Sequence, residues 1–505
     1  MRGMEDLDDD ACYRALQTRD ARFDGRMFTG VKTTGIYCRP ICPARTPKRE
    51  NVVFYPTAAA AQEAGFRPCL RCRPETSPDL GAWRGASNTV SRALGLIEAG
   101  ALDEGDVEAL ADRLGVGERQ LRRLFRQHLG ASPVAVAQTR RVLLAKQLIH
   151  ESRLPMAQVA LASGFGSIRR FNETFQALYG RPPGELRRTQ AAQAPLGADD
   201  ALTIRLAYRP PYDWDGLIAF LSYRAIPGVE AVSPDRYART VSLDGAHGLI
   251  EVRPLDGRRL AVEVRFPRLS ALPAIIARVR RVFDLAADPE AIAAHLGRDP
   301  VLAPLVAARP GLRAPGAWDG LELAVRAVLG QQITVKGATA LAGKLVAAHG
   351  QPLPEALAGR IEGLTHLFPT AQALAGADLA QLGMPRTRAQ TLSAVAQAAV
   401  DDPALFNPRG SLEAAVTRLK ALPGIGEWTA QYIALRQMRE PDAFPHGDIG
   451  LMRALADAEG RRPNPAELLA RAEAWRPWRA YAALHLWASE GAILNPESCD
   501  DRNAA

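Results

Sequence analysis

The sequence predicts a multidomain protein that is mainly α-helical with α+β parts. Its 505 residues allow three or four domains. Two polar stretches, residues 73–79 and 190–200, are typical of linkers. Where apolar residues recur regularly, their spacing is mostly that of α-helices. Between residues 202 and 266, strand-like runs occur instead. We therefore expect helical domains on either side of a segment that contains a sheet.

Composition and charge indicate a nucleic-acid partner and argue against a membrane protein. A hydrophobic content of 47% provides material for cores, and no apolar run is long enough to cross a membrane. The acidic opening at residues 5–10 lacks the features of a signal peptide, so we expect a cytoplasmic, nucleoid-associated protein. The net charge is +8, and residues 22–76 alone carry ten Lys and Arg against four Asp and Glu. Such a surplus is typical of DNA binding, although a solvated basic face would give the same count.

Four of the six cysteines form two close pairs. Cys38 and Cys42 have C-x3-C spacing, Cys69 and Cys72 have C-x2-C spacing, and 26 residues separate the pairs. Each pair places two thiolates on one side of a turn, and two pairs complete the tetrahedral shell that suits zinc. On metal-binding rules alone, a closed structural zinc site is the simpler interpretation. Basic side chains crowd the pairs and favour thiolates and phosphate binding. They are Arg39, Arg45, Lys48, Arg49, Arg67, Arg71 and Arg73.

Several motifs around the cysteines are more specific than their spacing. They are Arg19-Asp20-Ala21-Arg22, Thr33-Thr34-Gly35-Ile36-Tyr37-Cys38-Arg39-Pro40, Cys42-Pro43-Ala44-Arg45, Glu50-Asn51-Val52 and Ala64-Gly65-Phe66-Arg67-Pro68-Cys69. Over residues 10–74 the sequence closely resembles the amino-terminal domain of the Ada family of adaptive-response proteins. This resemblance implies that the four cysteines bind one zinc ion as cofactor, and that Cys38 also accepts a methyl group from a DNA methylphosphotriester. We expect DNA contacts from Thr34, Arg39, Arg45, Arg67 and Arg71.

Two pairs of short amphipathic helices are predicted in the next segment. Residues 107–116 form a helix that ends in a Gly turn, and residues 117–126 form a basic second helix. The pattern recurs at residues 156–165 and 167–175, with a connecting helix at 142–149. Each pair is a helix-turn-helix. A single match also fits ordinary helix packing, but two at this spacing favour sequence-specific DNA binding.

Together with Tyr179-Gly180-Arg181-Pro182-Pro183, the two pairs resemble the AraC-type DNA-binding domain over residues 86–188. The resemblance implies that the second helix of each pair enters successive major grooves of double-stranded DNA. RNA polymerase is the protein partner expected for such an activator. The candidate DNA contacts on these helices are Arg119, Arg122, Arg123, Arg169 and Arg170.

Strand-like runs at residues 202–208, 249–252 and 260–266, followed by a helix at 271–285, predict an α+β unit without visible chemistry. Its motifs Tyr212-Asp213-Trp214 and Val279-Arg280-Arg281-Val282-Phe283-Asp284-Leu285 resemble the amino-terminal subdomain of the AlkA family of alkylpurine glycosylases.

A second stretch with chemistry begins at residue 412. Helices at residues 412–421 and 427–438 flank Leu422-Pro423-Gly424-Ile425-Gly426, which forms a helix-hairpin-helix turn. Gly424 and Gly426 permit close approach of backbone N–H groups to a DNA phosphate, and the following helix N-terminus adds partial positive charge. Alone, such a turn is more often an ordinary loop.

Three motifs accompany the hairpin, namely Ala324-Val325-Arg326-Ala327-Val328-Leu329-Gly330-Gln331-Gln332, Phe444-Pro445-His446-Gly447-Asp448 and Trp475-Arg476-Pro477-Trp478-Arg479-Ala480-Tyr481-Ala482. Over residues 200–495 the sequence resembles the helix-hairpin-helix glycosylase superfamily and is nearest to AlkA. The resemblance implies that Asp448 is the catalytic carboxylate, which stabilises an oxocarbenium-like sugar and orients water. Trp428, Tyr432 and Trp487 are the expected base pocket, because aromatic faces attract a cationic alkylated purine. Core packing of these rings is the alternative.

Several features depart from the two families. Glycosylases that also cut the DNA backbone carry a lysine where this chain has Trp428, and tryptophan cannot form a Schiff base, so we expect a monofunctional enzyme. Gln332 stands where AlkA has an apolar wedge that fills the gap left by a flipped base, and we expect Gln332 to contact DNA. Cys499 is the only cysteine of this half, too few for an iron–sulfur cluster. A glycosylase also replaces the usual alkylguanine transferase domain of Ada.

The sequence therefore predicts a fused alkylation sensor, transcription activator and base-excision enzyme. One alternative is a zinc-containing AraC-type regulator with a catalytically inactive glycosylase-like half, which would release no base from alkylated DNA. Another is a metabolic regulator whose middle domain binds a small ligand. The expected domains are a small zinc-binding α/β domain (1–76), an all-α double helix-turn-helix domain (84–190), an α+β subdomain (200–311) and an all-α helix-hairpin-helix glycosylase domain (312–496).

Overall fold

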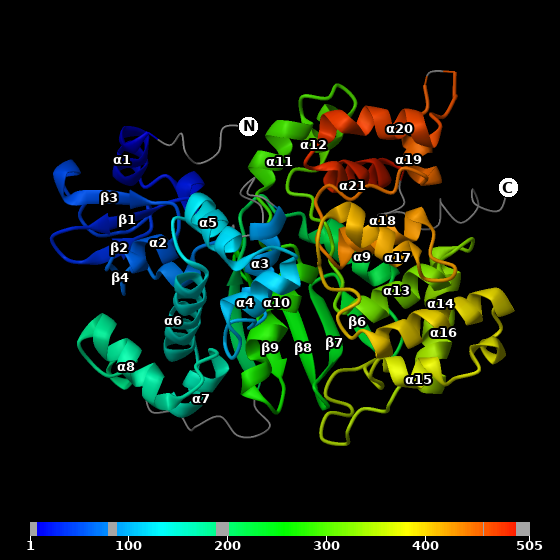
Figure 1. The fold of residues 1–505 in the computed structure, drawn as a ribbon, viewed down its shortest axis with the longest axis horizontal. Coiled ribbons are helices and arrows are strands. Elements are labelled where there is room, and N and C mark those ends of the chain that lie inside the picture. Colours follow the sequence, from blue (N-terminus) through cyan, green and yellow to red (C-terminus); the bar gives the residue numbers. More distant parts are fainter. Residues whose placement is uncertain (1–7, 79–87, 188–200, 458, 491–505) are drawn as a thin grey trace. The chain divides into compact units, whose positions relative to one another are not determined.

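The computed structural model describes residues 8–78, 88–187, 201–457 and 459–490, and Figure 1 shows its elements. The described chain is mainly helical, with a four-stranded sheet near the amino terminus and further strands between residues 202 and 265, which confirms the predicted fold class. It divides into two compact units. The first comprises residues 1–208, 259–277 and 285–287, and the second comprises residues 209–258, 278–284 and 288–505. The finer division into four domains stays a prediction.

The sheet of the first unit brings the two cysteine pairs together. Its order is β3-β1-β2-β4, and β2 runs parallel to β4. Parallel strands end at the same edge of a sheet, so Cys38 at the end of β2 lies near Cys69, which follows β4. The elements of this domain are α1 (Asp9–Thr18), β1 (Phe28–Val31), β2 (Ile36–Cys38), β3 (Val52–Tyr55), α2 (Ala58–Glu63) and β4 (Arg67–Pro68).

Both predicted helix-turn-helix pairs are present. The first pair is α4 (Val107–Leu114) with α5 (Glu118–Leu129), and the second is α7 (Met156–Ala162) with α8 (Ile168–Tyr179). Gly115, with φ of 70°, ends α4 in the left-handed conformation that favours glycine. The helix α3 (Asn88–Glu98) before the first pair was not predicted.

The connecting helix α6 (Pro133–Glu151) is longer than the predicted 142–149. Its buried residues lie on all sides and include the polar Arg141, Lys146 and Gln147. A helix that is enclosed in this way lacks the one-sided apolar stripe by which helices are recognised in a sequence. The central position of α6 therefore explains why its length was underestimated.

The segment predicted as the first linker is not loose in its described part, residues 73–78. Pro74–Thr76 forms a short 3-10 helix, and the Arg73 guanidinium pairs with Glu75 at 3.0 Å and with Glu151 of α6 at 2.9 Å. The prediction was wrong because proline and charged residues are typical of linkers, whereas the partner of Arg73 lies far along the chain. The second predicted linker, residues 190–200, lies outside the described residues.

A buried lysine of α6 contacts the segment that carries Cys69 and Glu75. Lys146 Nζ donates to the carbonyl oxygen of Cys69 and to the Glu75 carboxylate, each at 2.7 Å. The Lys146 side chain has no exposed area, and that of Glu75 has 1%. A charge removed from water in this way is tolerated only when it is paired and hydrogen-bonded, so the segment that carries Cys69 and Glu75 is held on α6 by a specific polar contact.

Strands β5 and β9 belong to the first unit and pair antiparallel, while β6, β7 and β8 form an antiparallel meander in the second unit. The predicted strands correspond to β5, β8 and β9, and β6 and β7 were missed. These elements are β5 (Leu202–Ala207), α9 (Trp214–Tyr223), β6 (Glu230–Ser233), β7 (Arg236–Leu243), β8 (Ala246–Pro254), β9 (Arg259–Arg265) and α10 (Leu272–Val282).

The remaining helices belong to the second unit, and those from α13 to α18 contribute to an apolar core that includes Leu323, Leu345, Leu392, Leu419 and Ile433. They are α11 (Pro289–Leu296), α12 (Leu302–Ala308), α13 (Gly320–Leu329), α14 (Val335–His349), α15 (Ala371–Ala375), α16 (Arg386–Asp401), α17 (Leu412–Lys420), α18 (Glu427–Arg436), α19 (Ile449–Ala454), α20 (Pro465–Ala472) and α21 (Arg479–Ser489). Among the described residues, no helix is long and apolar enough to cross a membrane.

Replacing Lys146 by methionine should weaken the contact between α6 and the segment that carries Cys69 and Glu75. Lys146→Met leaves the Glu75 carboxylate buried without its cation, a change that typically costs about 3–5 kcal/mol. Hydrogen exchange at the amides of α6 measures the free energy of local opening. Lys48→Met is a matched control, because its ion pair with Glu50 is exposed and contributes little. Equal exchange in both variants would contradict a structural role for Lys146.

Candidate functional site

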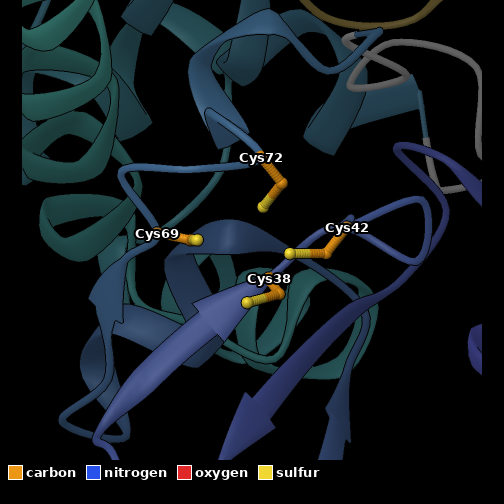
Figure 2. A group of neighbouring side chains, drawn as sticks. All are labelled: Cys38, Cys42, Cys69 and Cys72. Carbon is orange, nitrogen blue, oxygen red and sulfur yellow. The ribbon is translucent and has the colours of Figure 1, made fainter. Parts of the chain in front are cut away.

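The four paired cysteines form one compact cluster in the first unit. Their Sγ atoms all lie within 4.8 Å of one another, and Figure 2 shows the side chains converging on a common centre. Tetrahedral zinc bonded to sulfur at its usual distance needs sulfur atoms about 3.8 Å apart, so the cluster fits one zinc ion. This arrangement confirms the prediction that Cys38, Cys42, Cys69 and Cys72 together form one metal site.

Backbone N–H groups support the sulfurs. The Arg39 amide donates to Cys72 Sγ and the Arg71 amide donates to Cys69 Sγ, each at 3.3 Å. Such hydrogen bonds stabilise a thiolate, which is the form that binds metal. The loops that carry the cysteines are therefore shaped to hold negative sulfur.

The Arg39 side chain does not face the solvent, contrary to its predicted contact with DNA. Its Nε donates to Asp24 at 2.8 Å, and its Nη1 donates to the Cys72 carbonyl oxygen at 3.2 Å and to Thr76 at 2.6 Å. The residue is buried. Arg39 therefore fixes the loop that carries Cys72, a role that its position beside Cys38 in the sequence did not reveal.

The four cysteine residues of the cluster differ in exposure. Cys42, Cys69 and Cys72 are each 7% exposed, whereas Cys38 is only partly buried. Cys38 is thus the thiol of this cluster that a reactant can approach most readily.

The other predicted contacts of this unit lie mostly at the surface. Thr34, Arg45 and Arg71 are exposed, while Arg67 is half-buried and lies over the Tyr179 ring with 5.7 Å between its guanidinium carbon and the ring centre. The helix-turn-helix arginines are all exposed, as a groove-binding face requires. They are Arg119, Arg122 and Arg123 on α5 and Arg169 and Arg170 on α8.

A second site is built around Asp448 in the second unit. Asp448 caps the N-terminus of α19, and its carboxylate accepts the Leu451 amide at 2.9 Å. The indole N–H of Trp428 on α18 donates to Oδ2 at 2.7 Å, and that of Trp487 on α21 donates to Oδ1 at 2.9 Å. Three elements thus fix one carboxylate in position. Oδ1 accepts both the Leu451 amide and the Trp487 indole, whereas Oδ2 accepts one donor and retains a lone pair for a further partner.

An aromatic cavity of about 620 Å³ adjoins this carboxylate. Trp428, Tyr432, Asp448 and Trp487 line it, so the structure brings the predicted carboxylate and the three predicted pocket aromatics together. The Trp428 and Tyr432 rings are stacked, with 5.1 Å between their centres and 11° between their planes. A flat apolar wall beside a fixed carboxylate suits a planar, cationic ring.

Charged residues that were not predicted line the inner part of the same cavity. Arg436 Nη1 donates to the Tyr432 hydroxyl at 2.7 Å. Burial alone would raise the pKa of Tyr432, but the positive charges of Arg436 and Arg224 outweigh it and lower the pKa. Arg436 lies four residues after Tyr432, and this helical spacing was a usable signal. No local pattern marks Arg224.

A buried ionic network completes the cavity wall. Glu322 accepts from Arg239 at 2.7 Å and from Arg326 at 2.7 Å. Burial would raise the pKa of Glu322, yet the two guanidinium groups prevail and lower it to about 2. These partners lie on β7 and α13, so the network ties the sheet to the helical domain within this unit.

The predicted hairpin lies between α17 and α18. Gly424 has φ of 78°, and a Cβ atom there would meet Thr391 Oγ1 at 2.0 Å. Gly426 begins α18 at its N-cap, and its position is open. Gln331 Nε2 donates to the Gly424 carbonyl oxygen at 3.0 Å, which fastens the turn after α13 to the hairpin. The neighbouring Gln332 is exposed and has φ of 57°.

Family comparisons cover nearly the whole chain. Four family models match: "Metal binding domain of Ada" over residues 11–75, "Helix-turn-helix domain" over 110–189, "AlkA N-terminal domain" over 203–319 and "HhH-GPD superfamily base excision DNA repair protein" over 325–480. The Mycobacterium tuberculosis protein named "Probable bifunctional transcriptional activator/DNA repair enzyme AlkA" is 42% identical over 482 residues, which cover 95% of this chain and 96% of that protein. The chain belongs to this family of bifunctional activator and repair proteins.

Two further likenesses concern the second half of this AlkA-type family member. The Escherichia coli protein "DNA-3-methyladenine glycosylase 2" is 36% identical over 293 residues, which cover 57% of this chain and 97% of that protein. The structure of "3-methyladenine dna-glycosylase from Archaeoglobus fulgidus" has a TM-score of 0.50 at 22% identity and covers 57% of this chain and 97% of its own. The latter shows a shared fold.

Substituting Gly424 should damage the hairpin more than substituting Gly426. Gly424→Ala forces a side chain into the left-handed region and against Thr391, at a cost of about 2–4 kcal/mol. Gly426→Ala meets open space and should cost at most about 1 kcal/mol as a less favourable N-cap. Denaturant unfolding of the full-length variants measures both. Equal losses would show that the Thr391 contact does not shape the turn.

Proposed function

We propose that this protein joins two DNA-repair reactions to transcriptional control. In the first unit, Cys38 takes a methyl group from a DNA methylphosphotriester and thereby activates DNA binding by the helix-turn-helix pairs. In the second unit, the pocket beside Asp448 hydrolyses the N-glycosidic bond of alkylated purines such as 3-methyladenine. The observation that carries the proposal is the carboxylate of Asp448, held by two indole N–H groups at the wall of an aromatic cavity.

Methyl transfer to Cys38 is supported by the greater exposure of this residue among the four cysteines. The Cys38 thiolate attacks the methyl carbon, a C–S bond forms, and the C–O bond to the phosphate breaks. The electron pair of that bond leaves with the phosphodiester anion. Zinc held by Cys38, Cys42, Cys69 and Cys72 would keep the Cys38 thiol deprotonated yet nucleophilic at neutral pH. The product is a neutral thioether, so the domain loses one negative charge.

Loss of that charge is the link to transcription. A less negative surface beside DNA binds the phosphate backbone more tightly. The exposed arginines of α5 and α8 then hold the two recognition helices in the major groove. RNA polymerase is the partner that such an activator recruits.

Base release uses the second unit. The alkylated purine leaves the duplex and stacks on Trp428 and Tyr432, whose π faces favour a cationic ring. Asp448 faces the sugar and stabilises the positive charge that develops as the glycosidic bond breaks. Water then completes the hydrolysis, and the products are free base and an abasic strand. Because Trp428 stands where a Schiff base would require lysine, the strand stays intact.

Exposure to methylphosphotriester DNA should add one methyl group to Cys38 and to no other cysteine. Tandem mass spectrometry of the zinc-loaded protein locates it. Cys38→Ser should abolish labelling, while Cys12→Ser is the control, because Cys12 is buried outside the cluster. A methyl group on Cys69 would overturn the assignment.

Methylation of Cys38 should also raise the affinity of the protein for its operator DNA at fixed salt concentration. Equal affinities before and after methylation would contradict activation by methyl transfer.

Asp448→Asn should separate binding from chemistry. Asparagine still caps α19 but carries no charge, so base release should fall by roughly two to four orders of magnitude while affinity for alkylated duplex is kept. Chromatography of released 3-methyladenine measures the first and a gel-shift assay the second. Asp401→Asn, at an exposed end of α16, is the matched control. Undiminished release, or strand breaks without alkali, would refute the proposed mechanism.

A further inference from the structure

The inner part of the cavity beside Asp448 is positively charged, although a methylated purine is itself a cation. Arg436 is buried and Arg224 is half-buried, and both line the cavity. Their guanidinium carbons lie 4.8 Å and 4.0 Å, respectively, from the centre of the Phe220 ring. Arg436 donates to the Tyr432 hydroxyl, and Arg224 also interacts with it. The two cations therefore meet at the hydroxyl edge of a ring whose face belongs to the aromatic wall.

Neither of these two guanidinium groups has a carboxylate partner in the described chain. The carboxylates of the inner cavity belong to a network of two anions and two cations whose charges cancel, namely Glu230, Glu322, Arg239 and Arg326. Arg436 donates instead to two backbone carbonyl oxygens, at 2.8 and 3.3 Å. A cation withdrawn from water is unfavourable unless an anion compensates it. Burial accordingly lowers the pKa of the Arg224 guanidinium to about 10.

An anion that enters the cavity supplies the missing negative charge. A carboxylate suits the site, because the planar guanidinium presents paired N–H donors that match its two oxygens. A cavity of about 620 Å³ lies in the range that holds drug-sized ligands, so it has room for a substituent larger than methyl. The guanidinium carbon of Arg436 lies 5.4 Å from the centre of the Tyr432 ring. A short chain on a purine stacked on that ring can therefore reach the two arginines.

We propose that this cavity accepts purines whose N-alkyl substituent ends in a carboxylate, and that Arg224 and Arg436 bind the carboxylate. The inference rests on the proposed glycosylase function and names a substrate class for it, N-carboxymethylated purines such as 7-carboxymethylguanine. The alkylated ring of this lesion is cationic and stacks on the aromatic wall, while its anionic chain offsets the charge of the two arginines. Both arginines determine specificity and do not touch the glycosidic bond.

The hydrolysis itself is the one proposed for other alkylated purines. The bond between C1′ of the sugar and the base breaks, and its electron pair leaves with the base, whose ring becomes neutral. Water gives its hydroxyl group to C1′ and releases a proton. The carboxylate takes no part in these steps and leaves with the free base.

The first test separates charge from size in the full-length protein. Duplex DNA carries either 7-carboxymethylguanine or the uncharged 7-carbamoylmethylguanine, which has the same shape. The rate of enzymatic release is divided by the rate of spontaneous depurination, so that differences in leaving-group quality cancel. We expect this rate enhancement to be roughly ten- to a hundredfold larger for the carboxylate, the factor that hydrogen bonds to a charged group provide.

Replacing Arg224 should remove the preference for the carboxylate. Arg224→Met lacks the charge, whereas Arg224→Lys should keep part of the preference because a positive charge remains. Arg253→Met is the matched control and should keep all of it, because Arg253 is exposed, pairs with Glu251 and lies outside the cavity lining. A preference that is absent from the wild type, or that survives in Arg224→Met, would contradict the inference. Absence of 3-methyladenine release by the wild type would instead refute the glycosylase function.

Calorimetry on the wild type is independent both of turnover and of the folding of any variant. The free base 7-carboxymethylguanine should bind roughly ten times more tightly, or better, than 7-carbamoylmethylguanine. Free 3-methyladenine should compete with it for the same cavity. Equal affinities of the two guanine derivatives, or binding that 3-methyladenine does not displace, would show that the two arginines form no carboxylate site in this cavity.

Discussion

The hydrogen bonds that hold the Asp448 carboxylate are the interaction on which the second unit depends. A carboxylate that is partly withdrawn from water needs donors to replace its hydration, and here two indoles and a helix N-terminus supply them. Trp428 and Trp487 come from α18 and α21. The packing of α18, α19 and α21 therefore sets the position of this carboxylate. The fold of this unit thus places a charge at the wall of an aromatic cavity.

A comparable arrangement holds the first unit together. Lys146 binds the carbonyl oxygen of the metal-site residue Cys69 and the carboxylate of Glu75, and it projects from the helix between the two helix-turn-helix pairs. One buried cation of α6 therefore contacts both the backbone of a metal-site residue and the Glu75 carboxylate. On the proposed function, this contact would connect the loop of Cys69 to the helix between the two helix-turn-helix pairs.

Much of this organisation could be predicted from local sequence patterns. The spacing of Cys38, Cys42, Cys69 and Cys72 indicated a metal site, and two basic amphipathic repeats indicated the helix-turn-helix pairs, because both signals are short and periodic. The inward Arg39, the docked Glu75 and the length of α6 were not foreseen. Each depends on a partner far along the chain, such as Asp24 for Arg39 and Lys146 for Glu75. Pairings of this kind produce no local sequence pattern. Charged residues that take part in them are therefore predicted to lie at the surface or in a linker.

On the proposed function, the cysteine cluster and the aromatic cavity place a single-use reagent and a reusable one in the same polypeptide, at a fixed ratio of one to one. The transferred methyl group would stay on Cys38 as a stable thioether, whereas Asp448 would be regenerated in every cycle. A molecule that had recorded damage to a phosphate would then still remove damaged bases. In a growing cell the methylated fraction would become a running record of past exposure, erased by dilution and new synthesis.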